Sequence, residues 1–169
     1  MYRSAYHFAR PAASSGSAQA EYFVATVNTA GGYNDTSTYQ LVLDLEDSDG
    51  LGASAVWTWV QDFVQRIKSL TGRAPIIYTG YYFWQDNVGA PTDNLDCPLW
   101  IAAYTSSAES YVPPAWSGVG WAFWQYDDNG AASPGGAAAS IPGISGNVDV
   151  DYFKNGGAYP SLGALCYEE

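Results

Sequence analysis

Two acidic residues, Asp44 and Glu46, lie two positions apart in the short apolar run 41–46 and are the first candidates for chemistry. Such a run, ended by turn residues, is typical of a buried parallel strand. Side chains two positions apart on a strand point to the same side, with Cα atoms about 6.6 Å apart. Two close carboxylates in a partly apolar cleft cannot both ionise freely, so we expect one to hold a proton near neutral pH. A protonated carboxyl group is the general acid that glycoside hydrolysis requires.

Asp149 adds a third carboxylate near the end of the chain, and Asp151 is expected to face the same way. Taken alone, an Asp-x-Glu pair usually marks a solvated strand end. The position of Asp44 and Glu46 at the carboxyl end of a buried strand favours a catalytic role, because ligand sites of parallel α/β proteins lie at that edge. As an alternative, the two residues and Asp149 could bind magnesium or calcium through oxygen. One histidine and two cysteines without metal-site spacing make a zinc site unexpected.

Aromatic side chains gather at the ends of other predicted strands, namely Tyr78, Tyr104 and the run Trp124-Gln125-Tyr126. For any single one of them, packing in the core or at its rim is the better interpretation. Several at the same edge as the acid pair favour a carbohydrate site, because sugar rings stack their apolar faces on aromatic rings. The single histidine, His7, is more typical of a hydrogen-bonded structural residue than of a base.

The elements that must position these side chains indicate an α/β protein. Besides 41–46, strands are predicted at 2–8, 75–80, 99–104, 120–126 and, weakly, 147–153. Helices are predicted at 17–29, at 56–70 and in a shorter stretch after Gly80; the second has apolar residues every three or four positions and Gly72 at its C′ position. A strand, a helix and a strand within about 40 residues favour a parallel sheet, open or closed as a barrel. Six strands are two fewer than a closed eight-stranded barrel has.

The composition excludes several classes of protein. A net charge of −11 and a pI near 4.1 leave no basic surface for nucleic acid or an anionic membrane. No run approaches the ~20 apolar residues that span a bilayer, and the first residues lack the apolar core of a signal peptide. No linker is evident, so residues 1–169 are expected to form a single domain with a flexible Ala/Gly-rich loop at 129–146. Whether Cys97 and Cys166 pair is left open.

Six short motifs occur in order along the chain: Tyr6-His7-Phe8-Ala9-Arg10-Pro11, Leu43-Asp44-Leu45-Glu46, Ile77-Tyr78-Thr79-Gly80, Leu99-Trp100-Ile101-Ala102-Ala103-Tyr104, Trp124-Gln125-Tyr126 and Gly146-Asn147-Val148-Asp149. Together they resemble glycoside hydrolase family 25, the lysozymes also called N-acetylmuramidases. The resemblance implies an irregular TIM-like (β/α) barrel. It also implies hydrolysis of the β-1,4 bond between N-acetylmuramic acid and N-acetylglucosamine in bacterial peptidoglycan, without a cofactor, in the cell wall or extracellular space.

The resemblance assigns roles to individual residues. Glu46 matches the family's proton donor, Asp44 the neighbouring acid on that strand, and Asp149 the acid near the end of the barrel. The substrate-binding residues implied are Tyr6, Tyr78, Tyr104, Trp124 and Gln125. The family is an exception to the two-carboxylate scheme, because it uses the N-acetyl group of the substrate as nucleophile. Asp44 is then expected to orient that group, while Glu46 acts first as acid and then as base.

The sequence departs from the family pattern at its start. Family members open with about two further strands, the first of which carries an acidic residue, so the barrel is expected to be incomplete at its N-terminal end. An open barrel edge favours self-association. A cell-wall glycan-binding module with weak or no catalysis is the alternative to an enzyme, and phage-type release by lysis is one route to the wall. Asp151 stands where the family more often has Asn.

Overall fold

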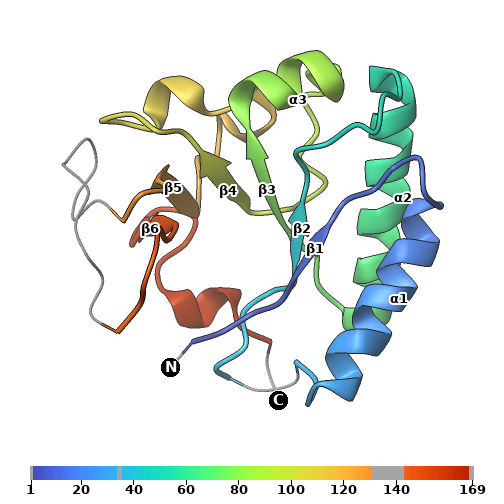
Figure 1. Cartoon of the computed structure of the whole chain (residues 1–169), viewed down its shortest axis with the longest axis horizontal. Coiled ribbons are helices and arrows are strands. Elements are labelled where there is room, and N and C mark those ends of the chain that lie inside the picture. The colour runs from blue at the N-terminus through green and yellow to red at the C-terminus, as the bar shows by residue number, and fades with distance from the viewer. Residues whose placement is uncertain (1, 34–35, 131–142, 168–169) are drawn as a thin grey trace.

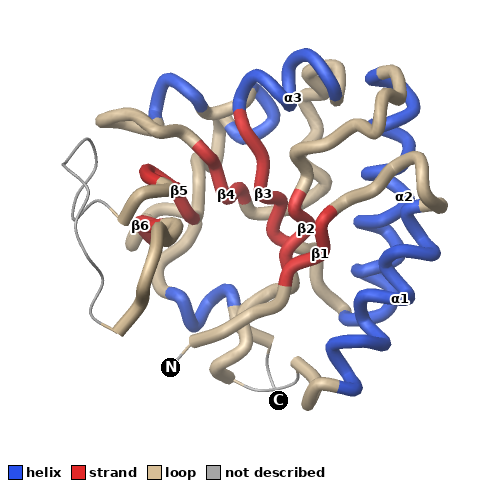
Figure 2. Tube along the Cα trace, viewed as in Figure 1, coloured by secondary structure: helices blue, strands red, loops and turns tan. Residues whose placement is uncertain are grey.

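The computed structural model describes residues 2–33, 36–130 and 143–167. In this part of the chain six strands form one sheet in sequence order: β1 (Tyr6–Phe8), β2 (Val42–Asp44), β3 (Ile76–Gly80), β4 (Leu99–Ala102), β5 (Phe123–Asp127) and β6 (Val150–Phe153). The helices are α1 (Gly16–Thr29), α2 (Ala53–Thr71) and α3 (Tyr81–Asn87), with 3-10 helices η1 (Glu109–Tyr111), η2 (Pro114–Trp116) and η3 (Leu162–Leu165). Figures 1 and 2 show the strands in a curved row, with α1 and α2 packed together beside β1 and β2.

Strand direction follows the connections between the strands. β1 to β5 are parallel to one another, and β6 runs antiparallel to β5. The predicted βαβ unit is present as β2, α2 and β3. No helix was predicted between β5 and β6, so nothing in the sequence requires the last strand to be parallel. Because parallel strands end at a common edge, the carboxyl ends of β1 to β5 meet on one side of the molecule.

The elements lie where the sequence predicts them, but the strands are shorter. The first strand covers only Tyr6–Phe8, and Arg3 before it makes an isolated bridge to Thr38 outside the sheet ladder. α2 ends at Thr71, and Gly72 directly after it has a φ of 77°, the left-handed conformation that suits the predicted helix-ending role of this glycine. Of the loop predicted at 129–146, residues 131–142 lie outside the described residues. In the part of the chain that is described, no helix is long and apolar enough to cross a membrane.

The two long helices approach closely at Gly16, the first residue of α1. A Cβ atom at this position would lie 2.3 Å from the carbonyl oxygen of Trp59 and 2.6 Å from the backbone nitrogen of Phe63, both on α2. Only glycine leaves room for this contact, and the N-terminus of α1 is capped by the Ser15 hydroxyl, which accepts the N–H of Ala18. This helix pair therefore forms a fixed support outside β1 and β2.

His7 belongs to this support. Its ring lies 5.5 Å from the ring centroids of both Phe23 and Phe63, and its Nε2 is 2.8 Å from Oε1 of Gln19. The side chain thus packs between the sheet and the helices, away from the carboxyl-end cavity described below. Cys97 and Cys166 are both buried and no disulfide joins them.

The sheet buries side chains on both of its faces. The outer face packs against the helices through residues such as Leu43, Ile77 and Ile101. The inner face holds a smaller cluster that includes Val42, Ile76, Ala122, Phe123 and Leu165. Since side chains alternate along a strand, the next inward positions after this cluster lie at the carboxyl ends of the strands. The inner cluster therefore forms the floor of whatever site lies there.

Candidate active site

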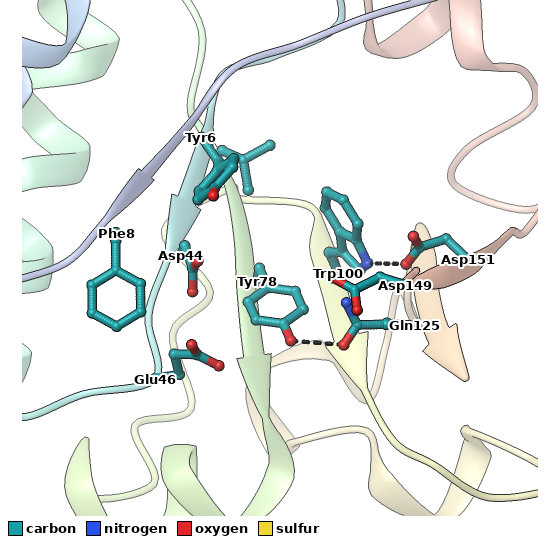
Figure 3. A pocket seen from close by; sticks show the side chains of 10 residues that line it. Tyr6, Phe8, Asp44, Glu46, Tyr78, Trp100, Gln125, Asp149 and Asp151 are labelled. Atoms are coloured by element: carbon teal, nitrogen blue, oxygen red, sulfur yellow. Dashed lines mark hydrogen bonds between the residues drawn. The ribbon is translucent and has the colours of Figure 1, made fainter. Parts of the chain in front are cut away.

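A cavity of about 430 Å³ opens at the carboxyl ends of the parallel strands, above the inner cluster (Figure 3). Its lining residues are Tyr6, Phe8, Val42, Asp44, Glu46, Tyr78, Trp100, Gln125, Asp149 and Asp151. They come from β1 to β6 and from the segments that directly follow or precede these strands. The volume is within the usual range for a small-molecule or sugar-unit site.

Asp44 and Glu46 enter this cavity together, as their spacing predicts. Asp44 is the last residue of β2, and backbone hydrogen bonds fix it on both sides. Its carbonyl oxygen accepts the N–H of Ala9, and the N–H of Leu45, the next residue, donates to the backbone carbonyl oxygen of Tyr78; both distances are 2.9 Å. Leu45 is fully buried in the outer core, which leaves its two acidic neighbours to point the other way. Figure 3 shows both carboxyl groups on the same side of β2.

The carboxyl group of Asp44 has a raised proton affinity. Its Oδ1 atom is buried and has no hydrogen-bond partner among the residues that the structure describes. Burial, and secondarily the negative charge of Glu46, raise the pKa of Asp44 to about 7. The sequence predicts that one member of the pair holds a proton near neutral pH, and in the structure this member is Asp44.

Gln125 connects two tyrosines at the far side of the cavity. Its Oε1 accepts hydrogen bonds from the hydroxyl groups of Tyr78 (2.8 Å) and Tyr104 (2.9 Å). Burial raises the pKa of Tyr78, and the charges of Asp44, Glu46 and Asp149 add to this effect. The tyrosines therefore remain neutral donors, and the amide fixes the position of both rings. Tyr104 is 56% exposed and is not one of the lining residues, but it adjoins the cavity through this bond.

Asp149 and Asp151 reach the cavity from the last strand. Asp149 is exposed and precedes β6, and its charge contributes to the raised pKa of both Tyr78 and Tyr104. Asp151 lies opposite Gln125 in the ladder between β5 and β6 and accepts the indole N–H of Trp100 at 2.7 Å. Although Asp151 as a whole is exposed, partial desolvation of its carboxyl group in the cavity raises its pKa to about 6; the hydrogen bond from Trp100 opposes this effect, and the charge of Asp149 adds to it.

Trp124 is the predicted binding residue that the structure does not bring to the cavity. It follows Phe123 and precedes Gln125 on β5, so its side chain points to the outer face. There it is 6% exposed, and its Nε1–H donates to the carbonyl oxygen of Ala103 at 2.7 Å. Strand alternation alone separates it from Gln125.

Four lining residues are not among the site residues predicted from the sequence: Phe8, Val42, Trp100 and Asp151, of which only Asp151 was expected to face the same way as Asp149. The alternation of side chains along each strand would have identified them. Phe8 and Val42 lie two positions from Tyr6 and Asp44, and Trp100 is the ladder partner of Tyr78. The alternative considered from the sequence, a magnesium or calcium site formed by Asp44, Glu46 and Asp149, can be compared with the positions of these carboxyl groups. In the described ranges no three acidic, His or Cys side chains are gathered closely enough to hold a metal ion, and Figure 3 shows the carboxylates spread around the cavity.

A curved α/β sheet with acidic and aromatic residues at the carboxyl ends of its strands is the architecture of barrel-type α/β proteins, whose sites lie at that edge. A sequence profile of the Glycosyl hydrolases family 25 matches residues 1–134, and the chain belongs to this family. Its relatives have the distorted TIM-like barrel, which confirms the predicted fold class.

Individual relatives agree with this assignment. Lysozyme M1 of Streptomyces globisporus is 38% identical over 165 residues, which are 94% of this chain and 51% of the relative. The solved lysozyme of Streptomyces coelicolor has a TM-score of 0.76 at 36% identity, covering 99% of this chain and 73% of that one. The muramidase of Acremonium alcalophilum has a TM-score of 0.74 at 37% identity, covering 96% and 72%. The chain thus spans about half the length of the first of these relatives.

Proposed function

We propose that this protein is a glycoside hydrolase that cleaves the β-1,4 bond between N-acetylmuramic acid and N-acetylglucosamine in bacterial peptidoglycan. The observation that carries the proposal is the pair Asp44 and Glu46, which share one cavity of sugar-unit size with a raised pKa on Asp44. Family membership and the lysozyme and muramidase relatives support the same reaction.

The mechanism we infer begins with Glu46 as general acid. Its proton passes to the glycosidic oxygen while the carbonyl oxygen of the substrate's own acetamido group bonds to the anomeric carbon and the glycosidic bond breaks. Water then attacks the anomeric carbon, the bond between this carbon and the acetamido oxygen breaks so that the acetamido group is restored, and the proton that the water loses passes to Glu46.

Asp44 supports this reaction from beside the acid. When the N–H of the acetamido group donates to the buried Oδ1 of Asp44, this hydrogen bond favours the ionised form of the carboxyl group, which then stabilises the positive charge that develops on the acetamido group. The aromatic rings of Tyr6 and Tyr78 and the fixed amide of Gln125 supply the sugar-binding surface. Asp149 lies beside Gln125, on the opposite side of the cavity from Asp44 and Glu46 (Figure 3). Tyr104 supports Gln125 from the rim.

The test is to incubate the chain and Glu46→Gln with purified peptidoglycan and to identify the new reducing-end sugar by mass spectrometry. We expect muramic acid reducing ends from the wild type and none from the variant. N-acetylglucosamine reducing ends, or equal release by both proteins, would contradict the proposal. Binding to the insoluble wall without any release, in a protein folded by circular dichroism, would identify a glycan-binding module instead.

We also propose the bacterial cell wall as the place of action, since the proposed substrate lies there. Self-association is a separate proposal. Among the described residues β1 pairs only with β2, and a hollow of about 360 Å³ lies between β1 and α1. Tyr6 and Tyr22 at this edge are 69% and 70% exposed. Sedimentation velocity across a range of concentrations should show a dimer that Tyr22→Lys weakens; a monomer at all concentrations would refute it.

A further inference from the structure

Trp100 and Asp151 are joined across the cavity although their strands are not neighbours. Trp100 is on β4 and Asp151 on β6, and β5 lies between these strands in the sheet. The indole Nε1–H of Trp100 donates to Oδ1 of Asp151 at 2.7 Å, which Figure 3 shows as a dashed line. This hydrogen bond uses the only donor of the indole ring.

The indole ring is held on its other sides by aromatic rings. Tyr78 meets it nearly at right angles, with centroids 5.6 Å apart and an interplanar angle of 86°. Phe123 from the inner cluster lies 5.4 Å away at 41°. These contacts restrict where the ring can lie, but aromatic edges alone do not fix its rotation. Asp151 supplies the one directional contact.

We propose that Asp151 is a positioning residue that holds the indole of Trp100 in the orientation in which its exposed surface forms an apolar wall for a bound sugar ring. The contact between Trp100 and a sugar ring rests on the proposed function, whereas the positioning of Trp100 by Asp151 does not. Asp151 touches no reacting group in the mechanism above, and it acts through Trp100. The residue is open to the cavity and its ionised form is the stronger acceptor, so the hold on Trp100 is sensitive to protonation.

In the described part of the chain, few groups can influence the protonation of Asp151. The titratable residues around Asp151 are Asp149, Tyr39 and Tyr126, with Asp44, Glu46 and Tyr78 in the same cavity. The tyrosines are neutral below pH 9, because burial raises the pKa of Tyr39, Tyr78 and Tyr126 above its ordinary value of 10. The carboxyl groups remain, and among them Asp149 acts on Asp151 directly. Since the pKa of Asp151 is about 6, its ionised form is lost as the pH falls through 6.

The first test needs no substrate. The indole N–H resonance of Trp100, assigned by its loss in Trp100→Phe, is followed between pH 4 and 8 by proton–nitrogen NMR. We expect this resonance to titrate with a midpoint near pH 6 in the wild type. In Asp149→Asn the midpoint should be lower, because the charge that raises the pKa of Asp151 is gone. In Asp151→Asn, which keeps an acceptor oxygen but has no charge, it should stay bonded and lose this titration. A resonance that is the same in Asp151→Leu as in the wild type would overturn the proposal.

The second test measures the glycan. Binding of soluble peptidoglycan glycan strands should weaken about ten-fold in Asp151→Leu and less than about two-fold in Asp151→Asn, because the amide oxygen still accepts the indole N–H. Asp86→Asn, on the exposed side of α3, is the matched control and should change neither measurement. If Asp151→Leu frees the Trp100 resonance yet glycan binding is unchanged, the wall role is refuted. If the proposed function itself is wrong, neither the wild type nor any variant releases muramic acid reducing ends, while the NMR result for Trp100 is still as expected.

Discussion

Asp44 and Tyr78 are ladder partners at the carboxyl ends of two neighbouring parallel strands, β2 and β3. Both side chains enter the same cavity, and burial raises the pKa of both groups. The charge on Asp44, when present, raises the pKa of Tyr78 further. The pairing therefore favours the neutral form of each residue, and the folded protein keeps Asp44 protonated at pH values below about 7.

This resistance has a consequence for stability. The pKa of Asp44 is about 7 in the folded protein against an ordinary value of 3.8, so between these values the folded chain binds a proton that the unfolded chain does not. The free energy of unfolding that this group contributes is fully present below pH 4 and is lost as the pH rises towards 7. Acid stability is thus the expected signature of Asp44.

Asp44→Asn should remove this effect. At pH 8 we expect the variant to be more stable than the wild type by about 1–2 kcal/mol, or roughly 3–6 °C in Tm, because no buried charge is left without a partner. At pH 4 the two proteins should melt together. Scanning calorimetry at both pH values measures this, with Asp86→Asn as an exposed control. A variant less stable than the wild type at pH 8 would show that the charge of Asp44 is compensated.

Gly16→Ala should destabilise the fold despite the higher helix propensity of alanine. The propensity gain is about 1 kcal/mol, whereas the added Cβ would lie 2.3 Å from the Trp59 carbonyl oxygen and must push α1 away from α2. We expect a net loss of about 2–3 kcal/mol in urea unfolding. Gly52→Ala is the matched control, because a Cβ added there would meet no atom within 4 Å beyond its chain neighbours and its φ is not positive. Equal stability of both variants would contradict the close contact.

The sequence predicts the helices and strands that position this site better than it predicts the protonation states inside the cavity. The apolar period of α2 and the continuous run 41–46 are strong signals, because burial against a sheet imposes them. Their positions fix Asp44 and Glu46 at the strand ends. Which carboxylate holds the proton depends on an oxygen buried without a partner, and that burial comes from several strands at once. No local pattern contains it.

The face of the sheet to which a side chain points is the second property that the sequence motifs do not determine. Motif matching selects Trp124 and Gln125 together, but adjacent residues of a strand point to opposite faces. Strict alternation from Asp44 and Tyr78 leads instead to Val42 and Trp100, both of which line the cavity. The direction of β6 is likewise unpredicted, because it depends on a connection without a helix.

The two tyrosines that share Gln125 should differ in importance. Both donate to the same oxygen, but Tyr78 lines the cavity whereas Tyr104 is 56% exposed. Tyr78→Phe should lower stability by about 1–1.5 kcal/mol and reduce glycan cleavage, since a buried acceptor loses one donor. Tyr104→Phe should cost less than about 0.5 kcal/mol, because water can replace the hydroxyl group. Thermal melts and reducing-end release measure both; larger effects at Tyr104 would reverse the assignment.

Trp100 and Trp124 offer a direct test of strand facing. Trp100→Phe keeps an aromatic ring but loses the bond to Asp151, so glycan binding should weaken by about 2- to 10-fold with little change in Tm. Trp124→Phe should leave glycan binding unchanged and lower Tm by several degrees, because it removes a buried bond to Ala103 and leaves a cavity of about one ring in the outer core. Isothermal titration with soluble glycan strands and thermal melts of both variants give the two readouts. If instead Trp124→Phe weakens glycan binding while Tm stays constant, the outward facing of Trp124 is contradicted. This tryptophan then contacts the sugar, and the binding surface extends from the cavity around the end of β5.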